Sequence, residues 1–178
     1  MNATVEVKLR RPADFGTDNG WAFVLLPKSE SDKFSRRGRT SAQGTINGLA
    51  FQGTLEPDGQ LSHWLKIPAS LMKDAGVAVG ECVALEVQPC VEELEPELPP
   101  AFRQLLDGSP EARQTWEGTT TIARIDWIHW MESAKQPKTR MSRLKDAREM
   151  LASGKKRVCC FDPSGYYSKS LSAPREAE

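Results

Sequence analysis

Apolar and polar positions alternate along roughly the first ninety residues. The segment "TVEVKL" places Val5, Val7 and Leu9 on one side of an extended chain, which is the period of two that predicts a half-buried strand. "GWAFVLLP" predicts a second, more deeply buried strand, and "SHWLKIP" and "VAVGECVALEVQP" predict two more. Short strands separated by frequent turn signals are typical of a small barrel rather than of a βαβ sheet.

The turn signals between these strands are specific. Asn47-Gly48 divides "RTSAQGTINGLAFQGTLEPDG" into two strand-like arms, and Asn-Gly supplies the two positive-φ residues of a type I′ hairpin. Between the last two strands, "ASLMKDAG" predicts a short helix that ends at Gly76.

The pattern changes after the barrel segment. "VEELEPELPPAF" is acidic and rich in proline, a composition that indicates a joint between domains. Beyond it, four segments have helical periodicity or caps, beginning at Pro100, Ser109, Thr119 and Lys138. The sequence therefore predicts an α+β chain in four parts: a small β-barrel over 1–90, a linker over 91–100, a helical bundle over 101–157 and a largely irregular tail over 158–178, whose last ten or so residues should be mobile.

The two last predicted helices have distinct faces. In the third helix, Trp127, Trp130 and Met131 share the apolar side with Ala123 and Ala134, whereas Asp126, His129 and Ser133 fall on the opposite, polar side. On this pattern His129 is expected to be a surface histidine. The fourth helix, roughly 138–152, is expected to turn Met141, Leu144, Ala147 and Leu151 inward, with Arg140 in the middle of that inward face and Arg143 on its shoulder.

The charge is concentrated in this last helix. The whole chain has 24 basic and 24 acidic residues, yet the stretch from Lys135 to Arg157 has nine basic residues against Asp146 and Glu149. A buried guanidinium at a helix N-terminus needs a negative partner. The structural explanation is a carboxylate, from Asp126 or Glu132 or from the linker. The functional alternative is an anion site formed by Lys135, Lys138, Thr139, Arg140 and Arg143.

A second functional hypothesis is nucleic-acid binding. Its surface would combine the basic patch Arg36, Arg37 and Arg39 with Lys155, Lys156 and Arg157. The neutral total charge and a pI near 6.8 argue against it, as does the absence of a recognition-helix motif. An enzyme is a third hypothesis, but no serine lies in a GxSxG-like elbow and no general base is evident.

The cysteine spacing and the hydropathy of the chain bear on whether it binds metal or spans a membrane. Cys82 and Cys90 lie in a strand-like segment, and Cys159 and Cys160 are adjacent. Adjacent cysteines form either a strained vicinal disulfide or two reduced thiols, and reduced thiols are expected. Without a CxxC pair or a ligand-like histidine, no metal or cofactor is expected. No run approaches the length needed to cross a bilayer, so a cytosolic protein without membrane insertion is predicted.

Several of these segments resemble a known family. "WIHWMESAKQPKTRMSRLKDAREMLASGKK" and the preceding "LPPAFRQLLDGSPEARQTWEG" are similar to the YdeI/OmpD-associated, or bacteriocin-protection, family. The N-terminal ninety residues resemble its frequent partner, a domain of unknown function with a double-split β-barrel related to AbrB-like folds, through Trp21, "GTINGLAFQGTL" and "AGVAVGECVALEV". Glu81 stands where aspartate is expected.

This resemblance implies a fold and a broad role. It implies a bacterial cytoplasmic protein linked to bacteriocin or envelope-stress tolerance, and it brings no established catalytic residues. The partner remains open between a small anion, a protein and nucleic acid, and the oligomeric state between a monomer and a homodimer.

Overall fold

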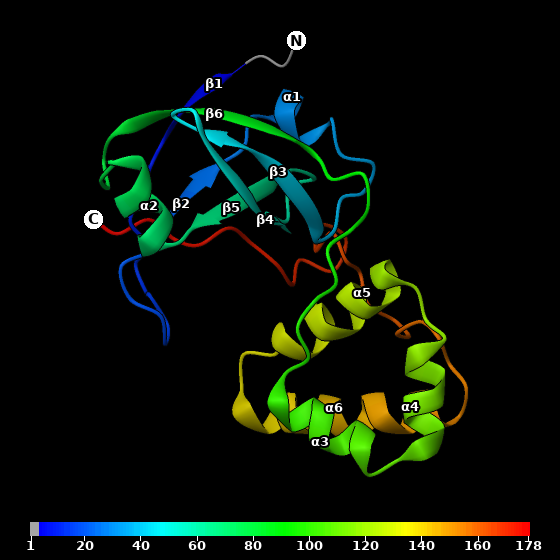
Figure 1. Ribbon diagram of the computed structural model, residues 1–178. Helices are drawn as coiled ribbons and strands as arrows, with labels where there is room; N and C mark the ends of the chain where they lie inside the picture. Colours follow the sequence, from blue (N-terminus) through cyan, green and yellow to red (C-terminus); the bar gives the residue numbers. More distant parts are fainter. Residues whose placement is uncertain (1–3) are drawn as a thin grey trace. The chain divides into compact units, whose positions relative to one another are not determined.

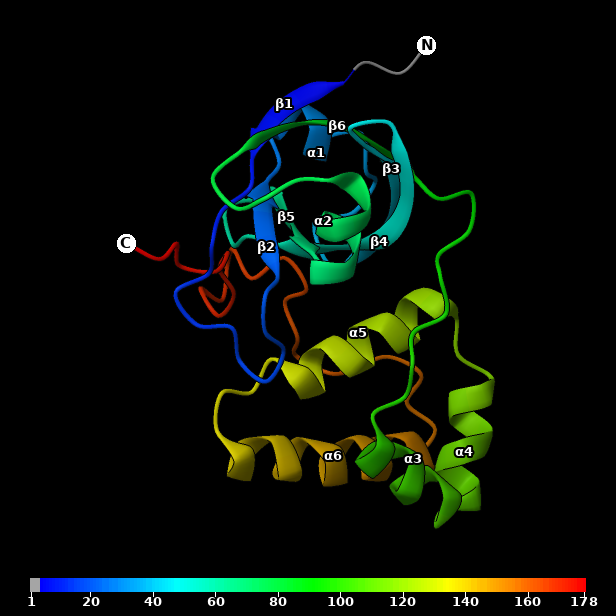
Figure 2. The same cartoon turned by 60° about the vertical axis from the view of Figure 1, so that its left-hand side comes forward.

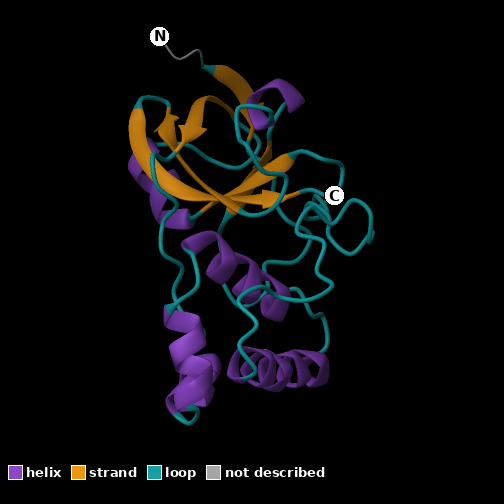
Figure 3. Cartoon of the chain, turned by 90° about the vertical axis from the view of Figure 1, so that its right-hand side faces the viewer, coloured by secondary structure: helices purple, strands orange, loops and turns teal. Residues whose placement is uncertain are grey.

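The structure, a computed structural model, describes residues 4–178. The chain divides into two compact units, each of which is described by itself. The first comprises Met1–Glu92 together with the C-terminal segment Ser164–Glu178, and the second comprises Glu93–Pro163. All six strands belong to the first unit, whereas the second is built from helices and loops (Figure 3). The α+β class predicted from the sequence is confirmed.

The strands of the first unit form a nearly closed antiparallel barrel (Figure 1). They are β1 (Val5–Lys8), β2 (Ala22–Leu25), β3 (Thr40–Ile46), β4 (Leu49–Pro57), β5 (His63–Ile67) and β6 (Cys82–Pro89), in the order β1-β6-β3-β4-β5-β2. The two edges meet where Arg10 and Phe23 exchange backbone hydrogen bonds of 2.8 and 2.9 Å. The double-split topology of the barrel stays a prediction.

The central hairpin forms where the sequence predicts it. β3 and β4 pair from Ile46 opposite Leu49 to Thr40 opposite Leu55. Asn47 and Gly48, between them, have φ values of 47° and 82°, which are the positive angles of a type I′ turn. The Asn47 side chain also accepts a hydrogen bond of 2.8 Å from the backbone N–H of Ala84 in β6. The hairpin turn is thereby tied to the neighbouring strand.

Alternating side chains fill the barrel interior. In β6, Val83, Leu85 and Val87 are fully buried while the residues between them are half-buried or exposed. The strands curve around the short helix α2 (Ala69–Ala75) (Figure 2), whose Met72 packs into the same core. α2 ends at Gly76 with φ 70°, as predicted. A single helical turn, α1 (Lys28–Ser31), was not predicted because four residues are too few for a period to show.

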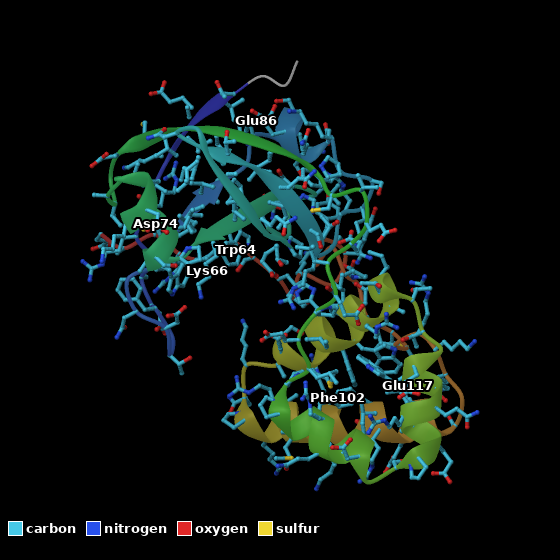
Figure 4. The ribbon with its side chains drawn as sticks, viewed as in Figure 1. Trp64, Lys66, Asp74, Glu86, Phe102 and Glu117 are labelled. Atoms are coloured by element: carbon cyan, nitrogen blue, oxygen red, sulfur yellow. The ribbon has the colours of Figure 1, made fainter. Side chains whose placement is uncertain are left out.

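The second unit contains the four predicted helices. They are α3 (Pro100–Asp107), α4 (Pro110–Glu117), α5 (Thr121–Glu132) and α6 (Pro137–Ala152). The side chains of Ser109 and Thr120 cap α4 and α5 by accepting backbone N–H bonds from Ala112 and Ala123. All four helices contribute to one apolar core, into which Phe102 points (Figure 4). No helix in the part of the chain described here is long and apolar enough to span a membrane.

The C-terminal tail is held against the barrel. The backbone N–H of Ala13 donates to Arg175 at 2.7 Å, and that of Ala177 donates to Arg11 at 2.8 Å. Glu176 adds an ion pair of 2.7 Å to Arg10, whose guanidinium lowers the pKa of this carboxyl through a hydrogen bond. These contacts place residues 175–177 beside the barrel, and the mobility expected for the tail stays a prediction. The tail lacks a periodic pattern because backbone groups make most of these contacts.

Candidate functional site

The start of α6 presents the predicted cations to solvent. Lys135, Lys138, Thr139 and Arg140 are all exposed. The expectation that Arg140 and Met141 face inward is wrong: Arg140 makes only a long hydrogen bond of 3.4 Å to the Ala134 carbonyl within the described residues, and Met141 is 50% exposed. The inward residues of α6 are Ala147 and Leu151, in its second half. The first turn of α6 does not pack against the apolar core of the helical unit, which contacts the second half of the helix.

Arg143 instead is the arginine that faces the protein. Its guanidinium donates to the Trp130 carbonyl at 2.6 Å and to the Ser133 hydroxyl at 3.0 Å, and it lies 5.2 Å from the centre of the Trp130 ring. The carbonyl belongs to the last turn of α5, where the helix dipole favours a cation. Arg143 therefore braces the α5–α6 connection through carbonyl and hydroxyl oxygens. The carboxylate partner had been expected for Arg140.

The linker acid has a different partner. Glu95 accepts hydrogen bonds from Arg124 at 2.5 and 2.9 Å and from the Thr121 hydroxyl at 3.1 Å. The bond from Arg124 holds the pKa of the Glu95 carboxyl below its usual range. This pair fastens the entry segment to the first turn of α5.

The polar side of α5 is buried as well as the apolar one. Asp126 and His129 are only 7% and 4% exposed, so the prediction that His129 is a surface histidine is wrong. The segment after α6 folds over this side, and the Phe161 ring packs edge-on against His129 at 5.3 Å. A cavity of about 130 Å³ lies beside it, lined by Ala123, Asp126, Arg157, Val158, Phe161 and Pro163. The sequence after Lys156 has no pattern that predicts packing of this segment against α5.

Two arginines of the barrel patch, Arg37 and Arg39, make contacts within the barrel unit. Arg37 donates to the carbonyls of Ser31, Phe34 and Leu61 at 2.9, 2.5 and 3.1 Å, which fixes the loop after α1. Arg39 pairs with Glu56 at 2.8 Å, with both side chains less than one fifth exposed. Arg36 is half-buried. In the helical unit, by contrast, Lys155, Lys156 and Arg157 are exposed.

A buried histidine beneath this loop forms a contact that the sequence did not reveal. Nδ1 of His63 lies 2.6 Å from the Ser31 hydroxyl, and Nε2 lies 2.9 Å from the Gly38 carbonyl. Burial lowers the pKa of His63, and the nearby Arg37 charge acts in the same direction. Both Ser31 and His63 are completely buried, so a substrate has no access to this serine–histidine pair. Its role is structural.

The outside of the barrel has a groove lined in part by amide side chains. Gln43 in β3 stands opposite Gln52 in β4 and Gln88 in β6, so three amides form a row across three strands. They line a groove of about 580 Å³ together with Gly44, Thr45, Ala50, Phe51 and Glu86. The placement of Gln43 and Gln52 around the Asn-Gly turn was readable from the sequence. The position of Gln88 depends on the β3–β6 pairing, which is not local.

Comparison with known families covers most of the chain. Residues 95–154 match the model described as "Bacteriocin-protection, YdeI or OmpD-Associated", and residues 6–87 match a domain of unknown function, DUF1905. No curated protein matches the chain. The two matched ranges follow the barrel and the four helices in order. The helical unit therefore matches the YdeI/OmpD-associated, bacteriocin-protection family, and the barrel that precedes it matches the domain of unknown function.

Proposed function

We propose that this chain is a non-catalytic binding protein of the bacteriocin-protection type, and that it contacts an anionic partner through the start of α6. The contact surface consists of Lys135, Lys138, Thr139 and Arg140. Arg143, the fifth residue of the anion site expected from the sequence, is not part of the contact surface. Its guanidinium donates hydrogen bonds to Trp130 and Ser133 and so positions the start of α6.

The observation that carries the proposal is the positive charge gathered at the first turn of α6. Gln136 occupies the N-cap position without a side-chain hydrogen bond, and the first turn contains no acidic residue. The backbone N–H groups of Lys138 and Thr139 are in the first turn, where a helix offers no carbonyl partner. α6 has 16 residues, so its dipole adds positive potential at the place where three cationic side chains gather. An anion lowers the energy of this arrangement.

The proposal is tested by titrating phosphate into isotope-labelled protein and following backbone amide NMR shifts. We expect saturable shifts centred on the Lys138 and Thr139 amides. The double variant Lys138→Gln/Arg140→Gln should weaken binding at least tenfold, since two charge-assisted contacts are lost. The matched control is Lys145→Gln/Lys155→Gln, which removes the same charge from exposed positions elsewhere and should bind as the wild type does. Shifts that grow linearly with ionic strength, or that fall equally in both variants, would contradict the proposal.

One observation keeps the nucleic-acid hypothesis as a second candidate: Lys155, Lys156 and Arg157 are consecutive and exposed. The barrel arginines do not strengthen it, because Arg37 and Arg39 make internal contacts. Fluorescence anisotropy with a short DNA duplex at two salt concentrations separates the two candidates. Phosphate contacts require affinity to fall steeply with salt, and the triple glutamine variant of these residues should abolish binding. Affinity that does not depend on salt rejects this candidate.

A further inference from the structure

A pair of thiols stands at the surface of the helical unit, apart from the charged start of α6. Sγ of Cys159 and Sγ of Cys160 are 3.0 Å apart, and both residues are exposed. Adjacent side chains in an extended chain point to opposite sides. Here they converge because Cys160 has a φ of 66°, in the left-handed region that costs a residue with a Cβ about 1 kcal/mol or more. Strained backbone of this kind often marks a functional position.

The turn that carries the thiols is anchored on both sides. Before it, the indole N–H of Trp127 donates to the Lys156 carbonyl at 3.1 Å, and Val158 packs against the helical core. After it, Phe161 packs against His129. These contacts hold the turn, and with it the two sulfur atoms, in one arrangement. Less conformational entropy is therefore lost when both sulfurs bind one atom.

Geometry opposes a direct bond between the two sulfurs. Neighbouring Cα atoms are about 3.8 Å apart, whereas disulfides span about 4.4–6.8 Å between Cα atoms. A third atom bonded to both sulfurs enlarges the ring by one member and relieves that mismatch. The hydrogen bond between the two thiols also raises the pKa of Cys160.

The donor set limits what the bridging atom can be. No group of three or more histidine, cysteine, aspartate or glutamate side chains able to hold a metal ion exists among residues 4–178. Structural zinc requires four ligands, so two thiols alone do not satisfy it. A soft, trivalent centre that already has one carbon substituent needs only two sulfur ligands.

We propose that Cys159 and Cys160 form a chelating site for monosubstituted trivalent arsenicals. In the binding step, an arsonous acid, R–As(OH)₂, meets the two thiols. Two As–S bonds form and two As–O bonds break, and each thiol proton leaves with a hydroxyl group as water. Arsenic remains trivalent and no oxidant is needed. Cys82 and Cys90 cannot bind one atom together, because they lie at the start and just beyond the end of β6, about 25 Å apart along the strand.

The test uses the full-length reduced protein and phenylarsine oxide, which hydrates to phenylarsonous acid. One equivalent should lower the number of titratable thiols from four to two and add one phenylarsenic group to the intact mass. A dithiol competitor should reverse the binding, and the same concentration of a monothiol should not. Cys159→Ser and Cys160→Ser should each weaken binding at least tenfold, with thermal midpoints equal to that of the wild type. The control variant Cys82→Ser/Cys90→Ser should bind as tightly as the wild type.

Three outcomes would overturn the site. The first is a wild-type protein that loses no thiols to one equivalent. The second is a single-serine variant at 159 or 160 that binds within tenfold of the wild type. The third is loss of binding in the control variant, which would assign the arsenical to the barrel cysteines.

Discussion

Two arginines one turn apart in α6 have opposite roles. Arg140 is exposed, whereas Arg143 donates to the Trp130 carbonyl and lies over the Trp130 ring. The sequence places both near the inward face, because a helical wheel fixes the angle of a side chain around the axis. It does not say how far along the axis the neighbouring elements reach. The anion site at the start of α6 stays a prediction, and identifying Arg143 as the arginine that faces the protein required the tertiary structure.

This difference predicts unequal effects of the same substitution. Arg143→Met keeps an apolar stem over Trp130 but removes the hydrogen bonds to Trp130 and Ser133. We expect the free energy of unfolding to fall by about 1.5–3 kcal/mol, the usual range for hydrogen bonds of charged groups. Arg140→Met, the matched control, should change it by less than about 0.5 kcal/mol. Urea unfolding followed by tryptophan fluorescence measures both. Equal losses in the two variants would refute the assignment of Arg143 as the brace.

At the scale of helices and strands, local sequence signals were sufficient to predict turns and helix ends that depend on neighbouring residues. The Asn47-Gly48 turn, the caps at Ser109 and Thr120, and the stop at Gly76 are all observed. The burial of Asp126 and His129 was not predictable, because an amphipathic pattern assumes that one side of a helix meets water. In this chain the segment that follows α6 covers the polar side of α5, and that segment is remote in sequence.

The barrel also contains a close approach that only the assembled sheet reveals. A Cβ atom at Gly44 in β3 would collide with the backbone carbonyl of Glu86 in β6. At Gly53 in β4, the nearest atom to an added Cβ is a Leu65 methyl at 3.6 Å, which is an ordinary contact.

Gly44→Ala should therefore disrupt the β3–β6 pairing and lower the free energy of unfolding by about 3 kcal/mol or more. Gly53→Ala, on the partner strand of the same hairpin, should change it by less than about 1 kcal/mol. Urea midpoints of the two variants give the comparison. A Gly44→Ala protein as stable as the wild type would mean that β3 and β6 are further apart than described.

At the scale of the whole chain, the two units do not coincide with two continuous stretches of sequence. Composition predicted a linker over 91–100, and this boundary stays a prediction; the first unit comprises the chain up to Glu92 together with Ser164–Glu178. Composition did not predict that Ser164–Glu178 returns to the barrel unit. The tail pairs through backbone groups beside Arg11 and Ala13, and backbone pairing leaves little trace in side-chain patterns.

Deleting residues 164–178 tests this organisation. The Ala13 amide loses its acceptor, the Arg175 carbonyl, so its hydrogen exchange should accelerate at least tenfold. The Phe23 amide is the internal control, because its acceptor is the Arg10 carbonyl within the barrel itself, and its exchange should change far less. Residue-resolved exchange measured by NMR on the full-length and shortened proteins provides both rates. Unchanged exchange at Ala13 would show that the tail is not bound there in solution. Acceleration at Phe23 as large as that at Ala13 would show instead that the tail is required for the closure of the barrel.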